Sequence, residues 1–148
     1  MMEFYKKSVT YRIVIIGCGR LGANLADCLY DEGKEVIVVD KEETAFRKLS
    51  SSYGGLTLVS DATELDTFEE LNINKKTILI VVTDNDNTNI MISQIAREVY
   101  HIKTIICRLY DPQRECVYDE FHIETICPTF LSVHRIEHIL KDKGVQEA

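Results

Sequence analysis

Short apolar runs alternate with amphipathic segments along the whole chain, and this alternation predicts the fold. The runs are largely continuous, which is typical of strands buried on both faces of a parallel sheet. Between them, apolar residues recur at intervals of three and four, as they do on one face of a helix. Strands are predicted at residues 11–16, 35–39, 56–59, 77–82, 103–107 and 123–126.

A helix is predicted after each strand. Right-handed crossovers then give an α/β fold, a single domain with a Rossmann-like, doubly wound parallel sheet in the strand order 3-2-1-4-5-6. We expect the domain to span residues 11–141, between a flexible N-terminal arm (1–10) and a frayed tail (142–148). The predicted helices run from about 21 to 33, over 42–52 and 64–71, after the loop 83–87, from 111 onwards, and over 129–141.

A glycine-rich turn joins the first strand to the first helix. Residues 17–22 read Gly-Cys-Gly-Arg-Leu-Gly, and the spacing is informative because a strand precedes it and a helix follows. In such a turn Gly17 allows the tight bend, Gly19 lets a pyrophosphate approach the backbone, and Gly22 lets the helix pack on the strand. The turn therefore predicts a phosphate-binding site; the alternative is a glycine turn that only packs.

An acidic residue stands where a ribose would lie. Asp40 ends the second strand, 18 residues after Gly22, and its carboxylate can accept hydrogen bonds from both ribose hydroxyls. The same charge repels a 2′-phosphate, so NADP is disfavoured; the alternative is a solvated loop acid. Lys41 is either a contact to the ribose edge or an ordinary surface lysine. Arg20 either folds over the phosphates or is solvated.

The loop after the third strand is predicted to hold the adenine. Asp61 can accept from the adenine amino group, and an amide of this loop, which includes Ala62, can donate to the ring. Asp61 or Thr63 can also cap the helix predicted from residue 64, and the two roles can coexist.

Polar residues after the fourth strand are predicted to line the opposite wall. Thr83, Asp84 and Asn85 follow that strand directly, in a loop that can also cap the next helix. For Asp86 and Asn89, further into the helix opening, we expect a capping or surface role.

Arg108 ends the fifth strand and is expected to reach the same crevice, as a clamp for phosphate or carboxylate or as a partner of Asp84 or Asp111. A dehydrogenase also needs a group that moves a proton, commonly His, Lys or Tyr. The four histidines (His101, His122, His134 and His138) fall outside these loops. We therefore expect a protein that holds a nucleotide without reacting it.

Composition agrees with a soluble globular domain: 148 residues, 45% hydrophobic and 28% charged. The net charge of −7 argues against nucleic-acid binding, and no apolar run approaches the ~20 residues of a membrane span. The five cysteines include no Cys-x-x-Cys, which favours reduced, partly buried thiols in a cytosolic protein and argues against a zinc site.

Several motifs together resemble the TrkA N-terminal domain family, also called the RCK (regulator of potassium conductance) domain. They are the residues at 15–22 (Ile-Ile-Gly-Cys-Gly-Arg-Leu-Gly), Val-Val-Asp-Lys at 38–41, Ser-Asp-Ala-Thr at 60–63, the polar segment 82–89, Cys-Arg-Leu-Tyr-Asp-Pro at 107–112, and Ile-Cys-Pro at 126–128. Serine at 60 and histidine at 122 stand where the family usually has glycine. The predicted nucleotide-binding residues are Gly17, Gly19, Arg20, Leu21, Gly22, Asp40, Lys41, Asp61, Ala62, Thr83, Asp84 and Arg108.

The resemblance implies a cytosolic regulatory subunit, peripheral to the membrane, that acts on a potassium channel or transporter and senses NAD(H) or adenine nucleotides (ATP, ADP, AMP). It also implies homodimers through the last helix, which can assemble into rings. The family's usual C-terminal ligand-binding domain is absent here, so we expect a partner chain to supply it. The alternative function is a small NAD-dependent oxidoreductase, or a fragment of one.

The last helix independently suggests a partner, because its apolar residues cover more than one stripe. A surface helix that packs on a sheet needs one apolar face. Two interpretations follow, a deeply packed C-terminal helix or a two-fold homodimer contact, and with the family in view the second is favoured. The apolar residues of this helix are Phe130, Leu131, Val133, Ile136, Ile139 and Leu140.

Overall fold

The computed structural model describes residues 11–145, so the predicted arm (1–10) and the end of the predicted tail (146–148) lie outside the described residues. Six parallel strands form one sheet in the order β3-β2-β1-β4-β5-β6, which confirms the predicted topology. The strands are β1 Arg12–Ile16, β2 Glu35–Asp40, β3 Leu56–Val59, β4 Thr77–Val81, β5 Thr104–Arg108 and β6 Glu124–Ile126.

Helices follow every strand, but the second connection differs from its prediction. In place of an α-helix over 42–52, a 3₁₀ helix covers only Glu43–Lys48. Side-chain acceptors compete with the helical carbonyls here: the Ser50 amide donates to the Asp27 carboxylate, and the Ser52 amide to Ser50 Oγ, both at 3.1 Å. The helices are α1 Arg20–Asp31, η1 Glu43–Lys48, α2 Leu65–Glu70, α3 Asp86–Glu98, η2 Pro112–Arg114, α4 Glu115–Glu120 and α5 Pro128–Asp142.

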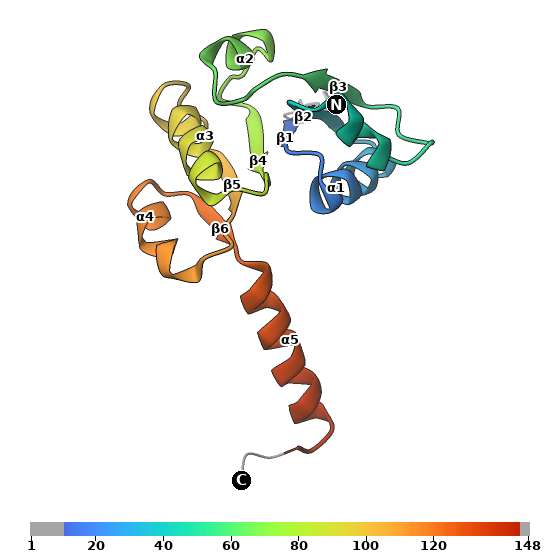
Figure 1. The fold of residues 1–148 in the computed structure, drawn as a ribbon, viewed down its shortest axis with the longest axis vertical. Coiled ribbons are helices and arrows are strands. Elements are labelled where there is room, and N and C mark those ends of the chain that lie inside the picture. Colours follow the sequence, from blue (N-terminus) through green and yellow to red (C-terminus); the bar gives the residue numbers. More distant parts are fainter. Residues whose placement is uncertain (1–10, 146–148) are drawn as a thin grey trace, which may run out of the picture.

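Alternate residues of each central strand face two apolar clusters, one on each side of the sheet. On β1, Val14 and Ile16 face the cluster that α2, α3 and α4 complete, whereas Ile13 and Ile15 face the cluster that α1 completes. Figure 1 shows α1 on one side of the strands and α3 and α4 on the other. Strand order reverses between β1 and β4, so the loops after these strands diverge and leave a crevice between them.

The turn before β6 contains a histidine in a conformation that glycine adopts more easily. His122, where the resemblance predicts glycine, has a φ of 54°, in the left-handed region that favours glycine. Its carbonyl accepts a hydrogen bond from the Arg97 guanidinium at 2.6 Å, which helps to hold the turn.

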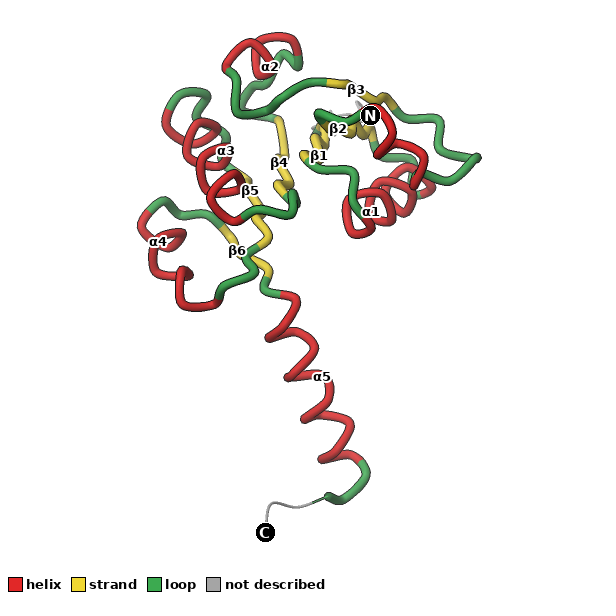
Figure 2. The backbone as a smooth tube through the Cα atoms, in the orientation of Figure 1, coloured by secondary structure: helices red, strands yellow, loops and turns green. Residues whose placement is uncertain are grey.

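The last helix leaves the body of the domain instead of packing on it. Figure 2 shows α5 as one continuous helix that extends away from the sheet after β6. None of its 15 residues, all within the described part of the chain, is buried. The interpretation of α5 as a deeply packed helix is therefore wrong, because no described element of this chain covers it. No helix in the described part of the chain is long and apolar enough to cross a membrane.

Candidate functional site

The glycine turn after β1 has three glycines with three different surroundings. Gly17 has a φ of +105°, and a Cβ there would lie 2.9 Å from the backbone of Val82 and Thr83. A Cβ on Gly22 would lie only 1.9 Å from the carbonyl oxygen of Gly17. A Cβ on Gly19 would meet nothing within 4 Å. The turn therefore needs Gly17 and Gly22 for its own geometry, whereas Gly19 keeps open the space beside the N-terminus of α1.

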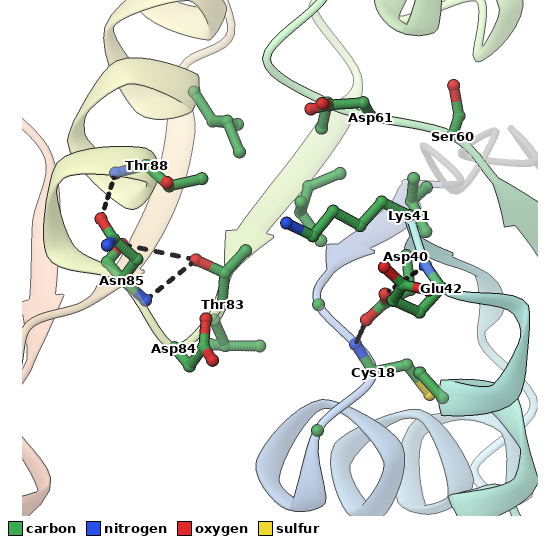
Figure 3. A pocket seen from close by; sticks show the side chains of 18 of the residues that line it. Cys18, Asp40, Lys41, Glu42, Ser60, Asp61, Thr83, Asp84, Asn85 and Thr88 are labelled. Atoms are coloured by element: carbon green, nitrogen blue, oxygen red, sulfur yellow. Dashed lines mark hydrogen bonds between the residues drawn. The ribbon is translucent and has the colours of Figure 1, made fainter.

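Asp40 ties the glycine turn to the end of β2. Its Oδ2 accepts the amide of Cys18 at 2.8 Å, and its Oδ1 accepts the amide of Glu42 at 2.9 Å. These bonds hold the half-buried carboxylate at the mouth of the crevice (Figure 3). Each oxygen has accepted one hydrogen bond and can accept another, so the carboxylate can still receive hydroxyl groups from a ligand.

The carboxyl ends of the strands enclose a cavity of about 700 Å³. Figure 3 shows Lys41 reaching from the β2 side toward the middle of this space, with Thr83, Asp84 and Asn85 on the opposite wall. The structure thus brings most of the predicted residues to one cavity, from loops far apart in the sequence. Those that line it are Gly17, Gly19, Asp40, Lys41, Asp61, Ala62, Thr83, Asp84 and Arg108.

Three predicted residues do not line the cavity. Arg20 and Leu21 are exposed on the first turn of α1, and Gly22 is buried beneath Gly17. The prediction also missed several lining residues, which flank the predicted ones. Most of them lie in the same loops as the predicted residues, and this was the signal in the sequence that could have found them. Those on η1 were missed because the segment 42–52 was predicted only as an α-helix, without a role in the site. The missed residues include Cys18, Glu42, Thr44, Ala45, Lys48, Ser60, Thr63, Thr88 and Ile92, whereas Asn85 lines the opposite wall as predicted.

Asp61 shapes its own loop and does not cap the following helix. Its Oδ1 accepts from the amide of Thr63 at 2.9 Å and from the Thr63 hydroxyl at 2.7 Å. These hydrogen bonds lower the pKa of Asp61, the hydroxyl bond having the larger effect. Residue Glu64 occupies the N-cap position of α2, and no side chain caps it. Asp61 is therefore an ionised acceptor at the β3 edge of the cavity.

The opposite wall is built from α3 and the end of β5. Asn85 caps α3 as predicted, since its Oδ1 accepts the Thr88 amide at 3.0 Å. Arg108 pairs with neither Asp84 nor Asp111, the predicted partners. Its Nη2 donates to the carbonyls of Val82 and Thr83, at 2.8 Å each, and its guanidinium lies 4.7 Å from the centre of the Tyr110 ring.

Asp86 and Asn89 have more specific roles than the predicted capping or surface ones. Asp86 accepts the amides of Tyr110 and Asp111, at 2.8 and 3.0 Å, and so caps the loop after β5. Asn89 is completely buried, so a surface role for this residue is wrong. The amide side chain faces the sheet because polar backbone groups at the ends of β4 and β5 need partners there.

The cavity lining has mixed charge. Carboxylates at the end of β2 and in the loops after β2, β3 and β4 line it together with two lysines and an arginine, so the site suits a ligand with both hydroxyl donors and anionic groups. No histidine lines the cavity among the described residues. The charged lining residues are Asp40, Glu42, Asp61 and Asp84, against Lys41, Lys48 and Arg108.

Cys18 lies in the glycine turn but is not a reactive thiol. The side chain is buried, and burial, with a further contribution from the Asp40 charge, raises its pKa to about 11. Burial likewise raises the pKa of Cys107 to about 11. Both thiols are therefore protonated at neutral pH, and the protonated form is not the nucleophile.

Alkylation rates should separate these cysteines from the exposed ones. At pH 8 we expect iodoacetamide to modify the exposed Cys28 and Cys116 roughly 100-fold faster than Cys18 and Cys107, because a raised pKa removes thiolate and burial blocks access. Peptide mass spectrometry over time measures each rate, and the same reaction in urea is the control. Fast labelling of Cys18 in the folded protein would contradict this assignment.

The fold and the crevice together define the structural class of this domain. A six-stranded parallel sheet, with a glycine turn at the switch point and an acid at the end of β2, is a Rossmann-type domain. Within that class, the chain belongs to the TrkA-N domain family, whose model matches residues 13–128.

Known proteins similar to this chain support the family and the fold. The Trk system potassium uptake protein TrkA of Streptomyces coelicolor is 39% identical over 114 residues, covering 77% of this chain and 51% of that protein. The chain spans about half the length of the curated relatives it matches first.

Solved structures of other proteins share the fold, among them the following two. The TrkA-N domain of the Escherichia coli inner membrane protein ybaL has a TM-score of 0.77 and 17% identity, covering 90% of this chain and 98% of that one. The AMP-bound Kef CTD of Shewanella denitrificans has a TM-score of 0.70 and 20% identity, covering 84% and 76%.

Proposed function

We propose that this chain is the nucleotide-binding regulatory domain of a potassium transport system and binds NAD(H) or an adenine nucleotide (ATP, ADP or AMP) in its crevice. The observation that carries the proposal is the Asp40 carboxylate, held by two backbone amides beside the open space at Gly19. A ribose hydroxyl pair fits the acceptors, and a phosphate fits the helix N-terminus next to them.

The remaining lining groups suit the other parts of such a ligand. Asp61 and Ala62 lie at the β3 end, where an adenine ring is expected beside the ribose. Arg108 and Thr83 lie across the cavity, where they can meet phosphate oxygens. Asp40 would repel a 2′-phosphate, so we expect NADP to bind poorly. The AMP-bound Kef domain supports an adenine nucleotide as the ligand.

The regulatory part of the proposal rests on the relatives. The Streptomyces relative is named as a potassium uptake protein, so we propose a membrane potassium channel or transporter as the partner of this chain and a cytoplasmic location beside it. We also propose homodimers through α5, whose apolar side chains are exposed.

An oxidoreductase is the less favoured alternative. A hydride transfer needs a group that moves a proton beside the cofactor. Of the residue types that most often do this in dehydrogenases (His, Lys and Tyr), the described lining residues include two lysines, Lys41 and Lys48, and neither a histidine nor a tyrosine. We expect no redox turnover with NAD(H) and small hydroxy or oxo acids, monitored by absorbance at the nicotinamide band.

A ligand series tests the Asp40 assignment. Calorimetric titration with NAD, NADH, NADP, ATP, ADP and AMP identifies the ligand. We then expect the protein to prefer AMP over 2′-deoxy-AMP by about 10-fold or more, since hydrogen bonds to a charged group contribute about 1.5–3 kcal/mol. In Asp40→Ala this preference should disappear.

Glu43→Ala is the matched control, because it removes an exposed acid from η1 that does not line the cavity. Binding of 2′-deoxy-AMP as tight as AMP by the unmodified protein would refute the ribose role of Asp40. Absence of binding to every nucleotide would refute the proposed function itself.

A further inference from the structure

Asn89 forms the most connected buried polar group beside the cavity. Its side chain is 0% exposed, on the first turns of α3 between the ends of β4 and β5. Its Oδ1 accepts the Thr83 amide at 3.1 Å and also the Thr83 hydroxyl. Its Nδ2 donates to the carbonyl of Thr83 at 3.2 Å and to the carbonyl of Arg108 at 3.1 Å. One amide therefore fixes the ends of two strands.

The residues that Asn89 holds are the ones that line the second wall. Thr83 and Arg108 both face the cavity, whereas Asn89 itself does not line it. The Thr83 carbonyl accepts from Asn89 and also from the Arg108 guanidinium, at 2.8 Å. The three residues thus form one hydrogen-bonded network, in which the position of the guanidinium depends on a carbonyl that Asn89 orients.

The chemistry of the network requires an amide. The two carbonyls need two donors, and the Thr83 amide and hydroxyl need an acceptor. Asparagine supplies both from one short side chain. Aspartate keeps the acceptor but loses both donors, and serine cannot reach all four groups.

We propose that Asn89 is a positioning residue for phosphate recognition: it holds Thr83 and Arg108 so that the guanidinium faces the phosphate of the bound nucleotide. The inference rests on the proposed function of the crevice. Asn89 acts through Arg108, so its contribution belongs to the phosphate and not to the adenosine part of the ligand.

The test compares AMP with adenosine on variants of the whole chain. In Asn89→Asp we expect AMP affinity to fall about 10-fold or more and adenosine affinity to change less than about 3-fold. Asn87→Asp is the charge-matched control, because it adds the same charge to α3 at an exposed position and keeps the acceptor for Arg114. Asn89→Ser removes both amide N–H donors without adding charge, and its shorter hydroxyl group cannot replace both bonds; it gives the same comparison if Asn89→Asp does not fold.

A double-variant cycle shows whether Asn89 acts through the arginine. Arg108→Gln should abolish most of the preference for AMP over adenosine, and adding Asn89→Ser to it should cause no further loss. Equal losses for AMP and adenosine, or independent losses in the cycle, would overturn the positioning role while the crevice still binds nucleotide. Failure of the unmodified protein to bind AMP and all other nucleotides would overturn the proposed function and this role with it.

Discussion

Gly22→Ala is expected to destabilise the domain by at least about 3 kcal/mol, with a fall in Tm of about 10 °C. The added Cβ would lie 1.9 Å from the Gly17 carbonyl oxygen, and the conflict is with backbone, which cannot rotate away. Either α1 moves off β1 or the turn opens, and both changes break apolar packing beside the cavity. Urea unfolding followed by circular dichroism measures the change.

Gly19→Ala is the matched control in the same turn. Its Cβ would meet nothing within 4 Å, and Gly19 has a φ of −77°, which any residue adopts. We expect a stability change below about 1 kcal/mol, because only the N-cap preference changes. AMP affinity should nevertheless fall, since the methyl group occupies the proposed phosphate approach. A Gly22→Ala protein as stable as the Gly19→Ala protein would contradict the packing role of Gly22.

Ile136→Glu is expected to weaken self-association at least about 100-fold, because the proposed two-fold contact would bury two new carboxylates. Val133, Ile136 and Leu140 recur at i, i+3 and i+7 on α5, with exposed fractions of 44%, 58% and 43%. An apolar helical face this exposed supports the proposed contact. Sedimentation velocity over a range of concentrations measures the dissociation constant.

His138→Glu controls for charge, because it places the same residue on the opposite face of α5. There the only described partner is Asp142, in an exposed pair at 3.0 Å. Both variants should unfold at nearly the same temperature as monomers, since neither site is buried in the monomer. An unmodified protein that sediments as a monomer at about 100 µM would rule out α5 as a strong dimer contact.

The sheet and the glycine turn could be predicted because neighbouring residues encode them. Continuous apolar runs such as that of β4 indicate strands buried on both faces, and the strand–turn–helix context made the turn at 17–22 specific. The same local reasoning failed for η1. The backbone amides of Ser50 and Ser52 end the helix because they donate to side chains and not to helical carbonyls. One of these acceptors, Asp27, belongs to another element.

The amino-acid sequence by itself determined where most of the strands and helices lie along the chain, the turn that opens α1 and the acid at the end of β2, since these depend on periodicity and on the sterics of adjacent residues. Only the tertiary structure decided which groups Arg108 and Asn89 contact and that α5 stands free of the domain. The reason is physical: Asn89 and Arg108 are 19 residues apart, and Arg108 and Thr83 are 25 apart. Such groups become partners only when parallel strands bring their carboxyl ends together.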